Sequence, residues 1–332
     1  MTEIEKEYYR RLALQEEYGG TNKPINKITP LVSVVTITYQ HAPYIRQCLD
    51  SILMQETDFP FELIIGEDGS TDGTREICIE YANKYPDKIR LFLRDRGLTQ
   101  YVTKDNRIVR FNGLFTRSEA RAEYIAICEG DDYWIDKGKL EVQLDIMSSR
   151  HDIVLVFSGA EVIGDSVEEL LFSNVQERYY TNSEIIDEWL IPTASVMFRR
   201  SAYVNCNIAY FLDPKIIYGD LLLWLSLAQY GKIYCLQKKM VCYRRHSGSM
   251  SSSFDLTRVR QMAEMYEQMA RFFGGKYRSN FQKKLSWLYL YLSIKQRLNI
   301  SSLKLLFLSF KTSPAVALKA IFNYLRKLNS QW

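Results

Sequence analysis

One short segment limits the folds open to this chain: the apolar run Tyr124–Cys128 passes directly into the acidic sequence Glu129–Trp134. A β-branched apolar run that ends in consecutive carboxylates is typical of a buried strand that delivers charge to the open edge of an α/β sheet. The adjacent carboxylates of Asp131 and Asp132 repel each other and resist desolvation, so they persist together where water or a cation neutralises them. We therefore predict a divalent-metal site for a phosphorylated ligand. A solvated turn, with Asp131 or Asp132 capping the next helix, is the alternative.

Strand and helix patterns alternate from residue 31 onward. Leu31–Tyr39 is a nearly continuous β-branched run, residues 44–55 have helical spacing, and Phe61–Gly66 is a second apolar run. A right-handed crossover between two such strands places their carboxyl ends at the same edge. The same reading predicts further strands at 89–93 and 153–157 and helices at 75–85, 113–123 and 139–149, and leaves 94–110 unassigned. The expected fold is α/β, a mostly parallel sheet flanked by helices.

Composition indicates the cellular compartment of the protein. The chain has 332 residues, enough for one large α/β domain, and its six cysteines form no Cys-x-x-Cys pair and no His/Cys cluster at metal-ligand spacing. Residues 1–18 are charged and lack the apolar core of a secretory signal. No apolar run reaches the roughly 18 residues that a membrane span needs. We therefore expect a cytoplasmic protein with reduced thiols.

A second group of polar residues follows the second predicted strand. Asp68 stands at the end of that strand, and the segment Glu67–Thr74 contains two glycines and several residues suited to capping a helix. The carboxylate of Asp68 could accept a hydrogen bond from a base N–H or a ribose hydroxyl. A well-capped turn without a ligand is the plain alternative.

Several short motifs follow one another in a particular order. They are Thr38–Gln40, Glu67–Thr74, Glu129–Trp134, Pro192–Arg200, Tyr218–Leu225, Tyr230–Ile233 and Tyr243–Gly248. Their order and spacing over residues 31–250 resemble family 2 glycosyltransferases of the GT-A fold. The resemblance implies inverting transfer of a sugar from a nucleoside-diphosphate sugar, UDP-linked, to a hydroxyl of a glycan or a lipid-linked glycan. It also implies a domain at 31–250, between an N-terminal helix and linker at 1–30 and a helical basic region at 251–332.

The resemblance assigns roles at the donor site. Tyr39 would stack on the base and Asp68 would hydrogen-bond it, while Asp131 would contact the ribose or the metal. Asp132 would ligate Mg²⁺ or Mn²⁺ on the diphosphate, with His246 as a second ligand. Tyr39 as a packing aromatic and His246 as a lone surface histidine are the alternatives. Where family members usually carry Asp, this chain has Glu129, so that carboxylate receives no role.

Asp220 is the expected general base. It opens an apolar helical run, so its carboxylate would lie at a helix N-terminus, where the dipole lowers its pKa and an apolar or anionic environment must oppose that effect. Its alternative role is an N-cap.

The C-terminal region carries charge of one sign. Residues 276–332 contain eleven lysines and arginines and no Asp or Glu, interspersed with aromatic and aliphatic residues. Such helices can lie on the anionic inner face of the cytoplasmic membrane, while packing on a partner helix or in a homodimer would use the same faces. No recognised nucleic-acid-binding module accompanies the charge, so a nucleic-acid partner is not expected.

A second class of function fits part of the pattern: a catalytically silent GT-A domain that binds nucleotide or scaffolds a glycan-assembly complex. The coexistence of Asp68, Asp131, Asp132 and Asp220 favours catalysis instead. A dinucleotide oxidoreductase is disfavoured because no glycine-rich phosphate turn follows the first strand.

Overall fold

A computed structural model describes residues 1–164, 172, 175–246, 255–295 and 300–319. The chain divides into two compact units. The larger contains residues 1–181, 189–214 and 223–246, and the smaller contains residues 182–188, 215–222 and the chain from 247 onward. The predicted domain end at residue 250 lies outside the described residues.

The larger unit is built on a mixed sheet. Its strands are β1 (Val32–Thr38), β2 (Phe61–Glu67), β3 (Ile89–Leu93), β6 (Tyr124–Ile127), β7 (Tyr133–Trp134), β8 (Ile153–Gly164), β9 (Arg178–Tyr180), β10 (Met197–Arg199) and β11 (Lys232–Arg245). They run in the order β3-β2-β1-β6-β10-β8-β11-β7, with β9 beside β11. The two strands of a separate hairpin, β4 (Gln100–Val102) and β5 (Ile108–Arg110), pair with each other.

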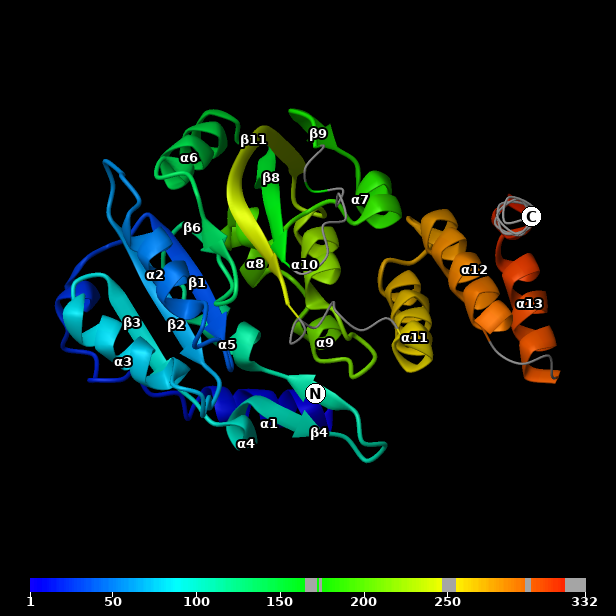
Figure 1. The fold of residues 1–332 in the computed structure, drawn as a ribbon, viewed down its shortest axis with the longest axis horizontal. Coiled ribbons are helices and arrows are strands. Elements are labelled where there is room, and N and C mark those ends of the chain that lie inside the picture. Colours follow the sequence, from blue (N-terminus) through cyan, green and yellow to red (C-terminus); the bar gives the residue numbers. More distant parts are fainter. Residues whose placement is uncertain (165–171, 173–174, 247–254, 296–299, 320–332) are drawn as a thin grey trace. The chain divides into compact units, whose positions relative to one another are not determined.

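The first half of the sheet is parallel, and this places the site. β1 pairs in parallel with β2 on one side and with β6 on the other, and β2 pairs in parallel with β3. β10 is antiparallel to both of its neighbours, β6 and β8. The carboxyl ends of β1, β2 and β6 therefore meet at one edge, as the sequence predicted (Figure 1).

Helices cover both faces of the sheet. The helices of the larger unit are α1 (Glu3–Leu12), α2 (Ile45–Leu53), α3 (Thr74–Lys84), α4 (Arg96–Thr99), α5 (Asn112–Ser118), α6 (Lys139–Ser149), α8 (Arg200–Val204) and α9 (Ile208–Phe211), with 3₁₀ turns at Pro24–Lys27 and Thr193–Ser195. Helix α10 (Gly219–Leu227) has residues in both units. Apolar residues of α2, α3 and α6 pack with Val32 and Val34 of β1 in one core cluster. Asn112 of α5 donates to the carbonyl oxygen of Gly66 at 3.0 Å on the other face.

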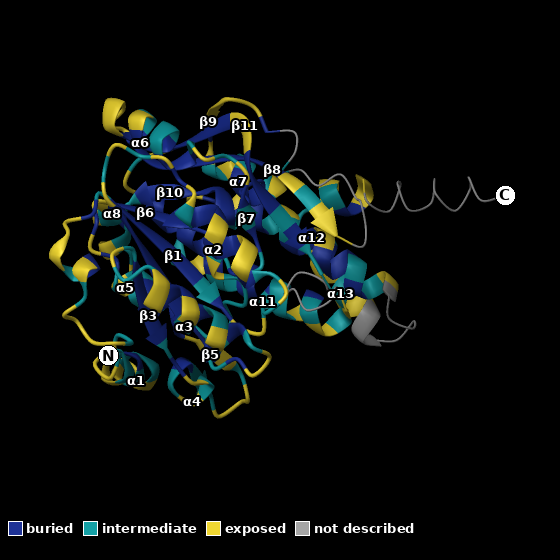
Figure 2. Ribbon diagram, turned by 60° about the vertical axis from the view of Figure 1, so that its left-hand side comes forward, coloured by how far each residue is buried: buried dark blue, intermediate teal, exposed yellow. Residues whose placement is uncertain are grey.

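Burial follows the pattern expected of a central parallel sheet. Every residue of β2 and β6 is buried, and the exposed residues gather on the outer sides of the helices (Figure 2). The predicted helix at 113–123 is shorter, ending at Ser118. The strand predicted at 153–157 continues to Gly164, where its last four residues are partly or fully exposed. The α/β class, with a mostly parallel sheet and a helical C-terminal region, is confirmed.

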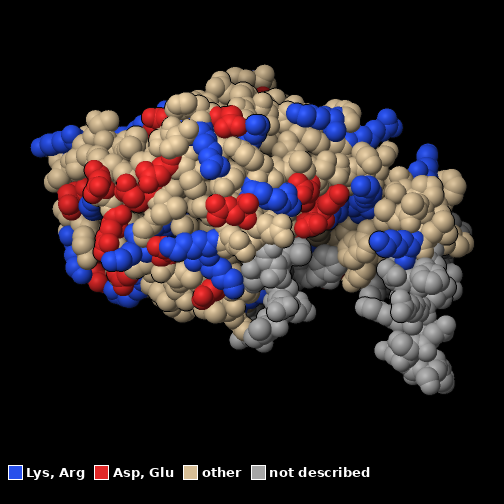
Figure 3. All heavy atoms as spheres, turned by 90° about the horizontal axis from the view of Figure 1, so that it is seen from above, with Lys and Arg blue, Asp and Glu red and all other residues tan. Residues whose placement is uncertain are grey.

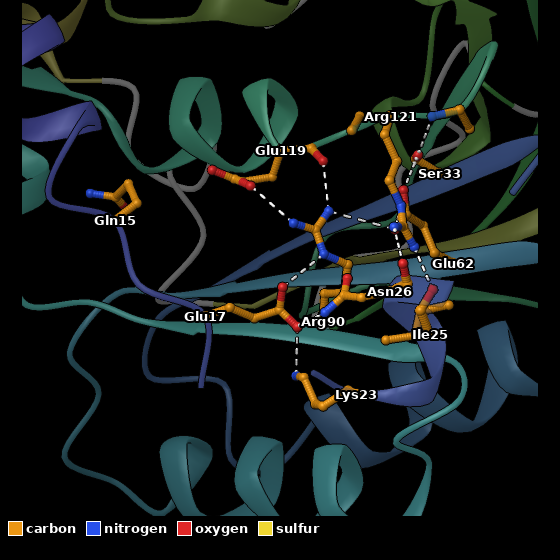
Figure 4. A network of polar contacts seen from close by, with 12 residues as sticks. Gln15, Glu17, Lys23, Ile25, Asn26, Ser33, Glu62, Arg90, Glu119 and Arg121 are labelled. Atoms are coloured by element: carbon orange, nitrogen blue, oxygen red, sulfur yellow. Dashed lines mark hydrogen bonds and ion pairs between the residues drawn. The ribbon is translucent and has the colours of Figure 1, made fainter. Parts of the chain in front are cut away.

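A buried polar network ties the N-terminal segment to the start of the sheet (Figure 4). The guanidinium of Arg90 lies 3.0 Å from carboxylates of both Glu17 and Glu119, and 3.6 Å from Glu62. Arg121 pairs with Glu62 at 2.9 Å and donates to the carbonyl oxygen of Ile25 at 2.6 Å. Residues 17–26 are thus attached to the sheet by charge as well as by packing.

The smaller unit is helical in its described part. It contains α7 (Asn182–Glu188), α11 (Leu256–Phe272), α12 (Arg278–Lys295) and α13 (Ile300–Thr312). Helices α12 and α13 meet through buried serines, where Ser286 Oγ donates to the carbonyl oxygen of Ser309 at 3.0 Å. The basic residues Arg297, Arg326 and Lys327 lie outside the described residues.

Two surface properties bear on partners. Among the described residues, no helix combines the length and the apolar character that crossing a membrane requires. On the face drawn in Figure 3, acidic and basic side chains are interspersed over much of the surface.

Candidate functional site

Three loops meet at the carboxyl edge of β1, β2 and β6. The backbone N–H of Asp68, just after β2, donates to the carbonyl oxygen of Thr38 at 3.0 Å. The N–H of Gly130, in the loop after β6, donates to the carbonyl oxygen of Ile37 at 3.0 Å. These bonds attach the loops that follow β2 and β6 to the end of β1.

The acidic loop after β6 faces two imidazoles. Oδ2 of Asp131 lies 3.2 Å from Nε2 of His246 and 3.8 Å from Nε2 of His41. Carboxylate oxygens of Glu129, Asp131 and Asp132 also lie within 4.8 Å of one another. His246 directly follows β11 and is only 14% exposed, so it is not a lone surface histidine.

Asp132 is oriented differently from its neighbour. It is 1% exposed, and its Oδ1 accepts a hydrogen bond from the backbone N–H of Arg244 at 2.7 Å. Its Oδ2 has no hydrogen-bond partner among the described residues. Neither Asp131 nor Asp132 caps the next helix, because α6 begins at Lys139 with Gly138 as its N-cap. The solvated-turn alternative is therefore wrong for these residues.

Arg244 holds the acidic loop in place. Its guanidinium donates to the carbonyl oxygen of Asp131 at 2.5 Å and to Oε1 of Gln47 at 2.6 Å. The same guanidinium lies 4.7 Å from the ring centre of Tyr44 and 5.0 Å from that of Tyr133. The long strand β11 thus joins the acidic loop to α2.

Burial and nearby charges shift the pKa values of Asp131 and Asp132 in opposite directions. Burial, followed by the negative charge of Asp131, raises the pKa of Asp132 well above its ordinary value. Burial also acts to raise the pKa of Asp131, but the hydrogen bond from His246 and the charge of His41 outweigh it, so that pKa is lowered. Burial lowers the pKa of His41, although Asp131 opposes the effect.

The residues of the acidic loop fit a divalent cation. Donor atoms of His41, Asp131 and His246 all lie within 4.8 Å of one another, close enough for small side-chain rotations to bring them around one ion. The buried Oδ2 of Asp132 also has no partner among the described side chains, and it lies beside Asp131. A cation there would neutralise carboxylates that otherwise repel each other.

A second polar cluster forms around Asp68 and Tyr39. Asp68 is buried and accepts hydrogen bonds from Thr99 Oγ1 at 2.5 Å and from Arg96 at 3.2 Å. The guanidinium carbon of Arg96 also lies 3.7 Å from the ring centre of Tyr39, which is 36% exposed. Asp68 caps no helix, since Gly73 is the N-cap of α3. Burial raises the pKa of Asp68, and Thr99 and Arg96 act in the opposite direction.

Asp220 lies in the first turn of α10, after Gly219, and therefore inside the helix and not at its cap. It belongs to the smaller unit. Its role as the general base stays a prediction.

The sequence did not reveal His41, Arg96 and Thr99 as site residues, and it gave Arg244 no catalytic role. His41 and Arg244 touch the acidic loop, and Arg96 and Thr99 hold Asp68. His41 carried a usable signal, because it lies in the turn directly after β1, at the edge where ligands were expected. Arg96 and Thr99 lie in the stretch at 94–110 that had no periodicity to assign.

A mostly parallel sheet with an acidic loop and a polar cluster at the carboxyl ends of neighbouring strands defines the class of protein as GT-A-like. A sequence profile described as Glycosyl transferase family 2 matches residues 33–205. The chain belongs to this family.

The chain is similar to a curated glycosyltransferase and to an uncharacterized protein, and it spans less than two thirds of the latter's length. The chain is 29% identical over 226 residues to the putative teichuronic acid biosynthesis glycosyltransferase TuaG of Bacillus subtilis, covering 68% of this chain and 82% of TuaG. It is 33% identical over 218 residues to the uncharacterized protein Rv1520 of Mycobacterium tuberculosis, covering 65% of this chain and 59% of that protein.

Solved structures share the fold. TarS 1–349 of S. aureus in complex with UDP-GlcNAc superposes with a TM-score of 0.56 at 20% identity, over 86% of this chain and 82% of that one. The mannosyltransferase PcManGT of Pyrobaculum calidifontis, in complex with GDP-Man and Mn²⁺, gives 0.52 at 18% identity, over 97% and 87%. These likenesses support the fold of the chain.

Proposed function

We propose that this chain is an inverting glycosyltransferase that moves a sugar from a nucleoside-diphosphate sugar, UDP-linked, to a hydroxyl of a glycan or a lipid-linked glycan. The observation that carries the proposal is the meeting of Asp131 and His246 at the sheet edge that also carries Asp68. Fold relatives whose structures contain UDP-GlcNAc, or GDP-Man with Mn²⁺, support a nucleotide-sugar donor and a cation.

The donor pocket follows from the chemistry of its side chains. Tyr39 offers an aromatic face for the base, and the Asp68 carboxylate offers an acceptor for a base N–H. Asp131 and His246 would hold Mg²⁺ or Mn²⁺ beside the diphosphate. When bound, that ion supplies positive charge that stabilises the departing diphosphate.

The burial of Asp132 favours a supporting role, which differs from the ligand role expected from the sequence. Its Oδ1 is engaged by the N–H of Arg244, so the carboxylate joins the acidic loop to β11. Asp131, 20% exposed and in contact with His246, is the better-placed ligand.

Asp220 is proposed to take the proton from the acceptor hydroxyl as that hydroxyl attacks the anomeric carbon. Attack from the face opposite the leaving diphosphate inverts the configuration, and a positioned base contributes typically 10²–10⁴-fold to the rate of such a step. Asp220 would then act in turnover, whereas Asp68 and Asp131 would act in donor binding. Substitutions can therefore test the two roles separately.

The test uses the purified chain with a panel of UDP- and GDP-sugars and Mn²⁺ or Mg²⁺, and measures donor binding and nucleoside-diphosphate release. We expect Asp131→Asn to lose metal-dependent donor binding. Asp220→Asn should bind the donor normally and turn over at least about 100-fold more slowly. Asp145→Asn, on the exposed face of α6, is the matched control and should match the unchanged chain.

Two outcomes would overturn parts of the proposal. Full transfer by Asp220→Asn would reject the base assignment. Donor binding with no turnover on any acceptor class would instead support the catalytically silent scaffold.

We also propose that the C-terminal helices bring the enzyme to the anionic inner face of the cytoplasmic membrane, where a lipid-linked acceptor resides. On α13, Leu303 and Phe307 are 56% and 67% exposed, and Lys304 and Lys311 are exposed as well. Residues 303, 307 and 311 are spaced by four and so lie on one side of the helix. An apolar centre beside lysines is the composition of an interfacial helix.

A further inference from the structure

The imidazole of His41 lies beside the acidic loop, although the proposed function assigns only Asp131 and His246 to the metal. His41 comes from the turn after β1, Asp131 from the loop after β6, and His246 from the end of β11. Nε2 of His41 lies 3.8 Å from Oδ2 of Asp131. That distance is too long for a hydrogen bond, so His41 does not serve as a hydrogen-bond partner of Asp131.

The spacing suits a shared ion. Protein nitrogen and oxygen ligands lie about 2.0–2.2 Å from a first-row transition metal, so two ligands of one ion are about 3–3.6 Å apart at ordinary ligand angles. The separations of 3.2 Å from His246 and 3.8 Å from His41 to Asp131 fall at or just beyond this range. A small rotation of the imidazole of His41 would complete the set.

The surroundings of His41 hold it toward the acidic loop. Its backbone N–H donates to Oγ1 of Thr74 at 2.8 Å, and its side chain is 18% exposed. Tyr44 packs beside both imidazoles, with ring centres 6.4 Å from His41 and 4.8 Å from His246.

Gly130 permits this close approach. A Cβ atom at residue 130 would lie 2.6 Å from Oγ1 of Thr38 and 3.0 Å from Nδ1 of His41. Any other residue would push the acidic loop away from the imidazole. The buried Oδ2 of Asp132 has no hydrogen-bond partner in the described part of the chain and lies close to the carboxylate of Asp131. A cation held by Asp131 would offset this buried negative charge at short range, without Asp132 being a ligand.

We propose that His41 is a third ligand, with Asp131 and His246, and that this two-imidazole, one-carboxylate set makes the site select Mn²⁺ over Mg²⁺. Imidazole nitrogen suits first-row transition metals, whereas Mg²⁺ takes oxygen ligands and keeps most of its water. The inference rests on the proposed function only in that the ion is the one beside the diphosphate. The ligand set itself can be tested without any donor.

The experiment titrates metal into the metal-free protein and follows binding by calorimetry and by the visible absorption of Co²⁺. We expect Mn²⁺ to bind at least tenfold more tightly than Mg²⁺. His41→Gln should reduce Mn²⁺ affinity at least tenfold, leave Mg²⁺ affinity within twofold, and change the Co²⁺ spectrum. His151→Gln, at the exposed third histidine of the chain, should change none of these.

A second measurement does not depend on the variant folding. Pulsed electron paramagnetic resonance of Mn²⁺ bound to the unaltered protein should show coupling to two imidazole nitrogens. Coupling to one nitrogen, or equal affinity for Mn²⁺ and Mg²⁺ that His41→Gln leaves unchanged, would overturn the inference. If sugar transfer proceeds while these metal results are negative, only the role of His41 fails; if the metal results hold and no donor is used, only the proposed function fails.

Discussion

The guanidinium of Arg96 covers the ring of Tyr39, its central carbon 3.7 Å from the ring centre. The same guanidinium donates to the carboxylate of Asp68 at 3.2 Å. The guanidinium therefore contacts both residues that are assigned to the nucleotide base: it stacks on Tyr39 and pairs with the charge of Asp68. This makes Arg96 the residue through which the donor pocket can best be probed.

We predict that Arg96→Ala weakens UDP binding and makes it more sensitive to acid. Burial raises the pKa of Asp68, and Arg96 opposes that effect, so removing the cation raises the pKa further. Asp68 would then take up a proton as pH falls, and a protonated carboxyl accepts a base N–H poorly. UDP affinity measured by calorimetry should drop more between pH 7.5 and 5.5 in Arg96→Ala than in the unaltered chain. Arg96→Lys keeps the charge beside Asp68 and should keep the pH profile of the unaltered chain, although it loses the planar stacking on Tyr39. Equal pH profiles for all three proteins would refute the coupling.

The exposed face of α13 gives a prediction about membranes. Phe307→Glu should reduce sedimentation with anionic liposomes, because it removes an exposed aromatic and adds a charge of the sign that the lipid repels. Each nearby lysine contributes on the order of 1 kcal/mol at most, so raising the salt concentration should weaken binding as well.

The control for this substitution is Val102→Glu, at a residue of β4 that is 58% exposed and lies in the larger unit. It should bind liposomes like the unaltered chain. Unchanged sedimentation of Phe307→Glu, or a change in its size on gel filtration without a change in sedimentation, would favour a protein partner or a homodimer for this face.

The polar network at the start of the sheet predicts a large loss of stability. Arg90→Met leaves the carboxylates of Glu17 and Glu119 without one of their cations, and removing one partner of a buried pair costs about 3–5 kcal/mol. The free energy of unfolding from urea titrations should fall by about 3 kcal/mol. Arg46→Met breaks an ion pair with Glu80 in which both side chains are about half exposed, and should lower the free energy of unfolding far less than Arg90→Met does. Similar losses in the two variants would show that the network contributes no more than a surface pair.

The sequence predicted the strands of the parallel half because their apolar runs are nearly continuous, as burial on both faces requires. Leu31–Tyr39 was expected as a strand, and β1 spans Val32–Thr38. The hairpin at 100–110 was not predicted because its strands have three residues each and are partly exposed, so they carry little periodicity.

The sequence predicted which strand ends carry the site, but it did not predict most of the side-chain contacts within it. Parallel pairing fixed which loops share an edge, and this brought Asp68 and the acidic loop together in the prediction. The contacts of His41 and Arg96 join loops far apart in the sequence, and no local pattern encodes them. The sequence also could not distinguish Asp131 from Asp132, because only the path of the turn decides which carboxylate faces the imidazoles and which one meets β11.

A buried lysine supplies a prediction about pH. Lys139, at the start of α6, is 0% exposed; its Nζ donates to Oε1 of Gln143 at 2.7 Å and lies 4.2 Å from the ring centre of Trp134. Burial lowers the pKa of Lys139 from 10.5 to about 7. Between these two values the unfolded chain binds a proton that the folded chain does not, so this lysine makes stability rise with pH across that window.

We expect Lys139→Met to remove this rise. Both free energies of unfolding are measured by urea titration from pH 7 to pH 9.5. The value for the unaltered chain minus the value for Lys139→Met should increase by at most about 1.4 kcal/mol per pH unit. Cysteine and tyrosine ionisation occurs in both proteins and largely cancels in the difference. Lys137→Met, at an exposed lysine paired with Glu56, should leave the difference flat over the same range. Parallel curves for Lys139→Met and the unaltered chain would mean that Lys139 keeps its proton in the folded state, with the Gln143 amide oxygen and the Trp134 ring sufficient to hold a buried ammonium.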